Sequence, residues 1–303
     1  MSDIPSLRRQ LADGPIVVAP GVYDGLSASL AERAGFTALY LSGASIAYTR
    51  FGRPDIGLVG MSEVADTLSA IRERVELPIV ADADTGFGNA LNVQRTVALF
   101  ERCGANGIQI EDQTLPKRCG HLAGKTLVAP GEMIGKIKAA LDARRSAETL
   151  IVARTDAAAV EGIDAAIERG QLYAEAGADM IFVEAPRSQA DLAAVVARIG
   201  KQALLMANMV EGGATPMRDA ASLQALGFRL VIFPGGLVRA VARLMTEYFS
   251  SLRRHGTTDP FGERMFDFAA LNAMLGTAEV LERGKRYDGE NFPGRAAKKG
   301  AAE

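Results

Sequence analysis

The stretch Glu101-Arg-Cys-Gly-Ala-Asn-Gly-Ile-Gln-Ile-Glu111 contains the unit from which the fold is built. Its first half ends a helical pattern at Gly104, and its second half is a short apolar run that ends in a carboxylate. A glycine just beyond a helix takes the left-handed conformation that closes the helix. The chain is therefore predicted to repeat a helix, a short turn and a strand. The same junction recurs at Gly35, Gly177 and Gly227.

Eight short apolar runs follow this pattern along the chain. Each is rich in aliphatic residues and is followed by a polar residue or a turn that contains glycine or proline. Continuous apolar runs of this kind are typical of strands that are buried on both faces of a parallel sheet. The runs are Ile16–Pro20, Ala38–Ser42, Pro78–Asp82, Gly107–Glu111, Leu150–Arg154, Met180–Glu184, Ala203–Ala207 and Leu230–Pro234.

Segments with helical spacing lie between these runs, for example Leu26, Leu30 and Ala34. Alternating strands and helices predict βαβ units, and eight of them favour a closed (β/α)8 TIM barrel, an α/β fold, over an open doubly wound sheet. We expect residues 1–287 to form one barrel domain with a C-terminal helical extension, and residues 288–303 to form a disordered tail. Residues 265–281 are more apolar than a peripheral helix needs, which indicates packing against a partner subunit.

The composition excludes several classes of protein. The formal net charge of −2 leaves no basic surplus that would attract nucleic acid or an acidic membrane. The N-terminal residues do not resemble a signal peptide, and no apolar run has the length of a membrane span. Two cysteines cannot form a disulfide framework, which indicates a reducing compartment. We expect a soluble cytoplasmic protein with neither nucleic-acid nor membrane partners.

Polar residues follow the predicted strands at their C-terminal ends, which in a barrel meet on the face that carries the active site. Any single polar strand end is ordinary, but a ring of carboxylates with one arginine and one asparagine indicates a site. The ring starts with Tyr40 and Ser42-Gly43-Ala44 and continues with Asp82, Asp84, Glu111, Asp112, Arg154, Asp156, Glu184 and Asn208, and Pro234 ends the eighth strand.

Asp82 and Asp84 are two residues apart, so on a strand both carboxylates would point the same way. Two carboxylates this close repel each other unless a cation lies between them. Oxygen ligands of this kind suit Mg²⁺, with Mn²⁺ as an alternative, and Glu111 and Asp55 could hold its outer waters. The other interpretation is that one aspartate caps the next helix.

Two further features accompany the acidic pair. Arg154 suits a substrate carboxylate, although it could equally form a salt bridge to a neighbouring acid. The segment Thr85-Gly-Phe-Gly-Asn89 is predicted to be a mobile loop beside the metal. A phosphate cradle is its rival interpretation, but the spacing matches neither the P-loop nor the dinucleotide fingerprint.

A thiol and an imidazole lie two residues apart in Pro116-Lys-Arg-Cys-Gly-His121. Cys119 and His121 make a compact acid–base unit, and the alternative is a polar loop with a buried thiol. A free thiol is mostly protonated at neutral pH, which suits an acid. Lys117, Arg118 and a protonated His121 would lower the pKa of the thiol, so a resting thiolate is also possible.

Together, Asp82–Asn89, Gly107–Gln113 and Lys117–His121 resemble the isocitrate lyase/phosphoenolpyruvate mutase superfamily, and the resemblance extends from about Pro15 to Gly284. The Lys-Arg-Cys-Gly-His segment resembles the lyase branch, because the mutase branch lacks that cysteine. The resemblance implies a (β/α)8 barrel whose eighth helix is exchanged between subunits. It also implies Mg²⁺ and a homotetramer built as a dimer of helix-swapped dimers.

The resemblance further implies carbon–carbon cleavage of a 2-hydroxy di- or tricarboxylate, of 2-alkylmalate or methylisocitrate type. The products would be a 2-oxo acid such as pyruvate and a second carboxylic acid. Cys119 would be the proton donor, Tyr40 would lie near the reacting centre, and either Tyr40 or a metal-side carboxylate would be the base. The resemblance assigns Asp82, Asp84 and Glu111 to the metal, Ser42, Gly43, Ala44 and Arg154 to the 2-oxo-acid half, His121, Glu184 and Asn208 to the other half, and Asp55, Lys117, Arg118, Gly120 and Pro234 to the rest of the substrate pocket.

The subfamily is set by smaller differences. Leu122-Ala-Gly-Lys125 resembles the dimethylmalate lyase and oxaloacetate hydrolase group more than the methylisocitrate lyases. Ala44 and Gly235-Gly236 depart from the family pattern at the predicted pocket, so the substrate side chain is expected to differ. The alternatives are hydrolysis of oxaloacetate to oxalate and acetate, a phosphonate or phosphoenolpyruvate mutase-type reaction, and a non-catalytic metal-binding role.

Overall fold

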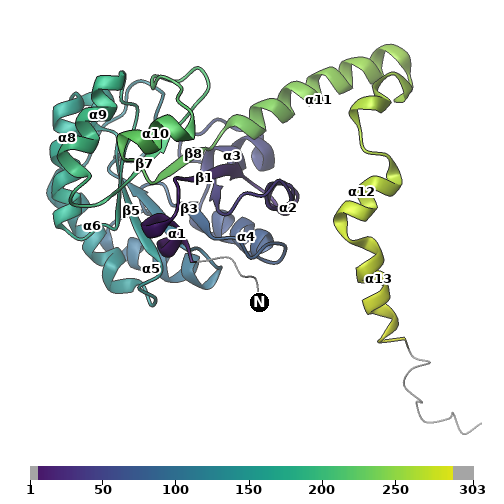
Figure 1. Cartoon of the computed structure of the whole chain (residues 1–303), viewed down its shortest axis with the longest axis horizontal. Helices are drawn as coiled ribbons and strands as arrows, with labels where there is room; N and C mark the ends of the chain where they lie inside the picture. Colours follow the sequence, from purple (N-terminus) through teal and green to yellow (C-terminus); the bar gives the residue numbers. More distant parts are fainter. Residues whose placement is uncertain (1–5, 289–303) are drawn as a thin grey trace, which may run out of the picture. The chain divides into compact units, whose positions relative to one another are not determined.

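The computed structural model describes residues 6–288, and eight parallel strands in it form a closed barrel (Figure 1). Each strand pairs with the next along the chain, and β1 closes the barrel by pairing with β8. The predicted TIM barrel is confirmed, and every predicted run overlaps a strand, although β1, β5 and β7 extend beyond the C-terminal ends of their runs. The strands are β1 (Val17–Val22), β2 (Leu39–Leu41), β3 (Ile79–Asp82), β4 (Gly107–Glu111), β5 (Leu150–Thr155), β6 (Met180–Val183), β7 (Leu204–Asn208) and β8 (Leu230–Phe233).

Helices cover the outside of the barrel between successive strands (Figure 1). The predicted junction glycines Gly35, Gly104, Gly177 and Gly227 all have positive φ, between 88° and 121°, as a glycine-closed helix end requires. The helices are α1 (Leu7–Asp13), α2 (Gly25–Arg33), α3 (Gly43–Phe51), α4 (Met61–Arg72), α5 (Ala90–Arg102), α6 (Pro130–Ala143), α7 (Ala157–Val160), α8 (Ile163–Glu175), α9 (Gln189–Ile199), α10 (Ala220–Leu226) and α11 (Gly236–His255), followed by the 3₁₀ helix η1 (Asp259–Arg264), α12 (Phe268–Leu275) and α13 (Thr277–Lys285).

The hydrophobic core has two layers, because the strands are buried on both faces. The outer layer packs the sheet against the helices and includes Val93, Val97 and Phe100 of α5. The inner layer fills the barrel and includes Leu7 and Leu11 of α1. These two leucines pack among side chains inside the barrel, and the polar strand ends lie at its other end.

The residues whose spacing predicts a helix do not always face the hydrophobic core. Leu26 and Leu30 of α2 are 45% and 37% exposed, whereas Ala28 and Ala31 of the same helix are buried. The helix itself forms where it is predicted, with Asp24 as its N-cap. The small residues pack on the barrel because they let the helix approach closely.

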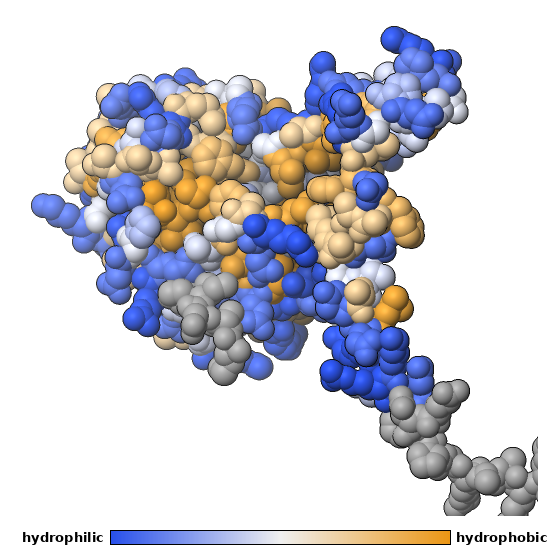
Figure 2. Space-filling model, turned by 45° about the vertical axis from the view of Figure 1, so that its right-hand side comes forward, coloured by the Kyte–Doolittle hydropathy of each residue, from blue (hydrophilic) through white to orange (hydrophobic). Residues whose placement is uncertain are grey.

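The chain divides into two compact units at the boundary between Ala240 and Val241. The second unit contains the rest of α11, η1, α12 and α13. Neither α12 nor α13 has a buried residue, and Figure 2 shows apolar surface over α12. The expected tail lies outside the described residues except for Asp288, and the single domain over 1–287 stays a prediction. Among residues 6–288, no helix combines the length and apolar character that crossing a membrane requires.

Gly21 of β1 is predicted to be indispensable for barrel closure. A Cβ atom there would overlap the carbonyl group of Pro234 and lie 2.6 Å from its Cα, and backbone cannot move aside without opening the β1–β8 pairing. Gly21→Ala should lower the free energy of unfolding by about 3 kcal/mol, measured by urea denaturation. Gly135→Ala is the control, since a Cβ on this exposed turn of α6 meets nothing within 4 Å, and it should raise that free energy by up to about 1 kcal/mol. Equal effects of the two substitutions would contradict the close approach.

Candidate active site

A pocket of about 580 Å³, partly open to solvent, lies at the C-terminal end of the barrel strands. The position agrees with the place where TIM barrels carry their active sites. Arg118 lies apart from the pocket, because its exposed guanidinium donates to the carbonyl of Ala123. Three other predicted residues do not line the pocket but lie next to residues that do, namely Gly43, Asp84 and Glu111. The predicted residues that line the pocket are Tyr40, Ser42, Ala44, Asp55, Asp82, Lys117, Cys119, Gly120, His121, Arg154, Glu184, Asn208 and Pro234.

The two aspartates of the predicted metal site meet, but not through strand alternation. β3 ends at Asp82, and Asp84 has a left-handed φ of 47°. A Cβ at Gly43 would lie 3.2 Å from Oδ2 of Asp82 and 3.8 Å from Oδ1 of Asp84. The two carboxylates therefore converge beside Gly43, whose missing side chain leaves them room. The next helix, α5, is capped by Asn89 rather than by an aspartate.

Four carboxylates, those of Asp55, Asp82, Asp84 and Glu111, form an acidic cluster. The cluster contains more negative charge than the neighbouring cations neutralise. Lys117 Nζ lies 2.5 Å from Asp55 Oδ1 and 2.7 Å from Asp84 Oδ1. Burial nevertheless raises the pKa of Asp84 to about 7, although Lys117 opposes the shift. Burial also raises the pKa of Glu111 well above its usual range, even with Arg154 beside it. Both shifts indicate a site that would gain from a further cation.

The donor set fits Mg²⁺ or Mn²⁺. Mg²⁺ binds through one or two carboxylates and keeps several waters. Asp82 and Asp84 supply the carboxylates, and Oε1 of Glu111 is buried with no hydrogen-bond partner in the described part of the chain. Such an oxygen can accept a hydrogen bond from a metal-bound water. Within residues 6–288, no group of three or more histidine, cysteine, aspartate or glutamate side chains is arranged so that it could hold a metal ion.

Gln109, which sequence reasoning missed, links Tyr40 to this cluster. The Tyr40 hydroxyl donates to Gln109 Oε1 at 2.9 Å, and Gln109 Nε2 donates to Asp82 Oδ1 at 3.3 Å. The opposite amide orientation would place oxygen against a carboxylate, so this orientation follows from the contacts. Asp82 Oδ1 also accepts from the Asp84 N–H at 3.1 Å. Oδ2 of Asp82 is therefore the oxygen left to face the Gly43 space.

Arg154 is held in place by Asp156. Its Nε donates to Asp156 Oδ2 at 2.9 Å and its Nη2 to Oδ1 at 3.0 Å. Nη1 lies 3.3 Å from Glu111 Oε2 and 3.5 Å from Glu184 Oε2. The salt bridge and the pocket position are thus both present, and every nitrogen of the guanidinium lies near a carboxylate of the protein.

His121, Glu184 and Asn208 form the opposite wall. Asn208 Nδ2 lies 3.1 Å from Glu184 Oε2, and its Oδ1 is buried with no hydrogen-bond partner among the described residues. The N–H of Ala214 donates to His121 Nδ1 at 3.2 Å, which leaves the imidazole proton on Nε2. Burial lowers the pKa of His121, so the ring is neutral at pH 7.

Cys119 is half-buried at the pocket and its thiol is protonated. Burial raises its pKa, and this effect outweighs the opposing hydrogen bond from the backbone of His121. The three expected cations do not counter the shift, because Lys117 binds two aspartates, Arg118 points away and His121 is neutral. The resting thiolate considered from the sequence is therefore not supported.

Arg239 and Tyr48 also line the pocket and were missed from the sequence. Arg239 Nη1 lies 2.5 Å from Glu211 Oε2. A Cβ at Gly235 would lie 2.9 Å from Arg239 Nη1, and a Cβ at Gly236 would lie 2.8 Å from Glu211 Oε1. The unusual glycine pair thus makes room for this ion pair. The signal in the sequence is an arginine one helical turn beyond the two glycines.

The segment Thr85–Asn89 is packed rather than loose. A Cβ at Gly86 would clash with Val93 of α5, and the ring of Phe87 packs edge-on against Phe100 with centroids 6.2 Å apart. Its glycines are therefore explained by close packing on α5. The expectation of a mobile loop finds no support in these contacts.

The chain matches the family model described as phosphoenolpyruvate phosphomutase over residues 7–253. It is 41% identical over 287 residues to a 2,3-dimethylmalate lyase of Eubacterium barkeri, which covers 95% of this chain and 99% of the relative. It is 46% identical over 277 residues to a 2-methylisocitrate lyase of Aeropyrum pernix, which covers 91% of this chain and 88% of the relative.

Solved structures give the same result. A 2,3-dimethylmalate lyase, described as a PEP mutase/isocitrate lyase superfamily member, has a TM-score of 0.87 at 37% identity and covers 95% of this chain and 96% of its own. Oxaloacetate acetylhydrolase with 3,3-difluorooxalacetate has a TM-score of 0.86 at 34% identity, and the match covers 93% of this chain and 96% of the hydrolase chain. Phosphonopyruvate hydrolase with oxalate and Mg²⁺ has a TM-score of 0.85 at 32% identity, and the match covers 95% of this chain and 99% of the hydrolase chain. The chain belongs to the PEP mutase/isocitrate lyase family.

Proposed function

We propose that this protein is a Mg²⁺-dependent carbon–carbon lyase that acts on a 2-hydroxy di- or tricarboxylate of 2-alkylmalate or methylisocitrate type. It releases a 2-oxo acid such as pyruvate and a second carboxylic acid. The observation that carries the proposal is that Cys119 lines one pocket together with Asp55 and Asp82 of the acidic cluster and with His121 and Asn208. Burial raises the pKa of the Cys119 thiol, which suits an acid. The two lyases that are 41% and 46% identical to the chain support the same reaction type.

The acidic cluster is the proposed metal side. Asp82 and Asp84 would hold Mg²⁺, and phosphonopyruvate hydrolase, a related structure, contains Mg²⁺ with oxalate. Mg²⁺ held there would supply Lewis acidity, which would make the substrate hydroxyl more acidic and stabilise the developing carbonyl. The N–H groups of Gly43 and Ala44 lie in the first turn of α3, where Ser42 is the N-cap. A helix N-terminus of this kind binds a carboxylate, and the guanidinium of Arg154, which lines the pocket, would bind one in exchange for part of its pairing with Glu111 and Glu184.

The base is assigned to a carboxylate of the acidic cluster rather than to Tyr40. The hydroxyl hydrogen of Tyr40 is donated to Gln109 Oε1, and an amide oxygen is a poor acceptor for a transferred proton. Tyr40 therefore cannot pass a proton onwards through its neighbour. Asp55, Asp84 and Glu111 have oxygens that can take one. Sequence reasoning left this choice open, and the contact with Gln109 favours the carboxylates.

The opposite wall would receive the second product. Cleavage leaves the bonding electron pair on the carbon next to a carboxylate, so negative charge spreads onto that carboxylate. The Nε2–H of the neutral His121 and the amide of Asn208 can stabilise this charge. Cys119 then donates its S–H proton to the carbon, and the resulting thiolate regains a proton before the next turnover.

Hydrolysis of oxaloacetate is the second candidate, supported by the similarity to oxaloacetate acetylhydrolase at a TM-score of 0.86. The same pocket would bind that substrate, and Gly235, the first residue of the Gly235–Gly236 departure, lies in its wall. A phosphonate or phosphoenolpyruvate mutase-type reaction is less well supported, because it gives no role to the acid Cys119.

The assembly is proposed to be a homotetramer, a dimer of helix-swapped dimers, as the family resemblance implies. Helices gain most of their stability from packing of an apolar face. In α12 and α13 no residue is buried, and Phe268 is 87% exposed. A second copy of the chain is the proposed cover for these apolar side chains. The two free cysteines fit a reducing cytoplasm as the proposed compartment.

Substrate choice is tested by a screen of 2-alkylmalates, 2-methylisocitrate and oxaloacetate with Mg²⁺, in which pyruvate, other 2-oxo acids and oxalate are measured. We expect a 2-alkylmalate or methylisocitrate to release a 2-oxo acid. Exhaustive chelation should abolish turnover, and added Mg²⁺ or Mn²⁺ should restore it. Undiminished activity after chelation would remove the metal from the proposal, and absence of turnover with every compound would remove the lyase.

Cys119→Ser should lower kcat by about 10²–10⁴-fold, because it removes the positioned acid. In the wild type, activity should fall as the thiol ionises, and since burial raises the pKa of Cys119 this fall should lie above about pH 8.5. The variant should lack that fall in its pH–rate profile. Cys103→Ser is the control, because Cys103 ends α5 and does not line the pocket. A wild-type rate for the Cys119 variant would exclude the thiol as acid.

Phe268→Asp should reduce the assembly, because it places a charge on the apolar side of α12 that is proposed to be covered by a second copy. Light scattering on a sizing column should give a tetramer for the wild type and a smaller species for the variant. Glu282→Gln, an exposed change on α13, should leave the mass unchanged. A monomeric wild type would contradict the proposed assembly.

A further inference from the structure

The loop that carries Cys119 and His121 is an excursion between β4 and α6. The loop comprises residues 114–126, and its two ends lie side by side. The N–H of Thr114 donates to the carbonyl of Thr126 at 2.9 Å, and Gln113 pairs with Leu127 as an antiparallel bridge. The position of the proposed acid therefore depends on what holds the tip of this loop against the barrel.

The first half of the tip has several attachments. Lys117 binds Asp55, and the N–H of Cys119 donates to the Asp55 carbonyl at 3.1 Å. The side chain of Gln113 holds Arg118 at two points, accepting from its N–H at 2.9 Å and donating to its carbonyl at 2.8 Å. These contacts fix the chain up to the thiol.

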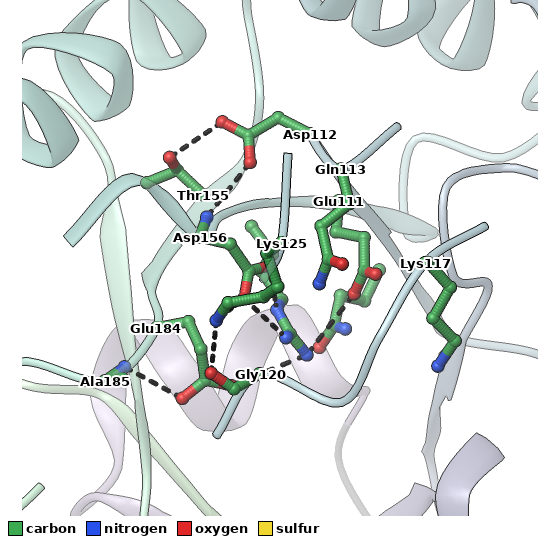
Figure 3. A network of polar contacts seen from close by, with 12 residues as sticks. Glu111, Asp112, Gln113, Lys117, Gly120, Lys125, Thr155, Asp156, Glu184 and Ala185 are labelled. Carbon is green, nitrogen blue, oxygen red and sulfur yellow. Dashed lines mark hydrogen bonds and ion pairs between the residues drawn. The ribbon is translucent and has the colours of Figure 1, made fainter. Parts of the chain in front are cut away.

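The second half is held by a buried lysine. Lys125 Nζ donates to the carbonyl of Gly120, the residue after Cys119, and to Asp156 Oδ1 at 2.8 Å (Figure 3). Its side chain is 1% exposed and that of Asp156 is 0% exposed. A buried ammonium group survives only where it is paired and hydrogen-bonded, and both conditions are met here.

Asp156 joins this lysine to the substrate side of the pocket. The same Oδ1 accepts from Arg154 Nη2 at 3.0 Å, and the N–H of Asp156 donates to the carboxylate of Asp112 at 2.9 Å. Lys125 and Arg154 both favour ionised Asp156, and its pKa is lowered to about 2 although burial alone would raise it. One carboxylate thus fixes both the loop and the arginine.

The loop lies directly against that arginine. A Cβ on Gly120 would lie 2.6 Å from Cγ of Glu184 and would overlap the guanidinium of Arg154. There is no room for a side chain between the loop backbone and the floor of the pocket. A small displacement of Gly120 would therefore displace the adjacent thiol.

We propose that Lys125 is a positioning residue, which fastens the Gly120 end of the loop to Asp156 and so holds Cys119 at its place in the pocket. The inference rests on the proposed function only in naming Cys119 as the acid. The geometry of the attachment is independent of the reaction. In this arrangement Lys125 does not contact the substrate but acts through the Gly120 carbonyl.

The experiment measures alkylation of each cysteine by iodoacetamide, followed by peptide mass spectrometry. Lys125→Met should increase the alkylation rate of Cys119 by about tenfold or more, because hydrogen bonds to a charged group are among the stronger ones and their loss frees the loop. Loss of the cation alone would make a thiolate less favourable and slow the reaction, so acceleration reports exposure. Cys103 provides an internal control and should react at the wild-type rate.

Kinetics provide the second readout, on whichever substrate the wild type turns over. Lys125→Met should lower kcat by about 100-fold and change KM by less than about threefold, because the thiol is misplaced while Asp156 still holds Arg154. Lys138→Met, an exposed change on α6, should alter neither value. A structural lysine without a positioning role would lower the amount of folded enzyme and leave kcat per folded molecule unchanged, which would overturn the proposal.

The alkylation result decides the proposal even if no tested compound is a substrate, so failure of the lyase assignment is distinguishable from failure of the attachment. Equal rates for Cys119 in the wild type and the variant would overturn it. Equal acceleration at Cys119 and Cys103 would show general loosening and would also reject it. If Lys125→Met does not fold, Lys125→Gln keeps a donor for Gly120, and a smaller but measurable acceleration at Cys119 is expected.

Discussion

The guanidinium of Arg154 is the charge on which the active end of the barrel depends. Three carboxylates, Asp156, Glu111 and Glu184, surround it and are almost fully buried. Each would be costly to bury unpaired, and the carboxylates together raise the pKa of Arg154 well above its usual range. An arginine this central holds the pocket together before any substrate arrives. Its structural role and its proposed substrate-binding role therefore cannot be separated by removing it.

Burial has one electrostatic effect throughout the site, which is to favour neutral groups. It keeps a proton on the thiol of Cys119 and removes the second proton from the imidazole of His121. An uncharged thiol next to an uncharged ring suits an acid and a hydrogen-bond donor better than a nucleophile and a base. Burial also raises the pKa values of Asp84 and Glu111, because the nearby cations do not fully compensate for it. A metal ion would add the missing positive charge and favour the ionised carboxylates.

Local sequence patterns predicted the barrel because each unit is local: an apolar run, a helix and a closing glycine such as Gly104 or Gly177, both with positive φ. The site was less predictable. Strand alternation placed Asp84 correctly for the wrong reason, since the chain turns after β3. Gln109 and Lys125 acquire their roles from partners 27 and 31 residues away, Asp82 and Asp156. Strand register and the path of a loop set those contacts, and neither leaves a local pattern.

The proposed acid, Cys119, separates the candidate reactions unequally. Lyase cleavage and hydrolysis of oxaloacetate both leave an electron pair on the carbon beside a carboxylate, and in both that carbon must receive a proton. A mutase that moves a phosphoryl group creates no such carbanion to protonate. The thiol therefore argues against the mutase but not between the other two. That second choice depends on what fits against the wall of Arg239 and Gly235, where an exposed ion pair, weak enough to rearrange, faces the pocket.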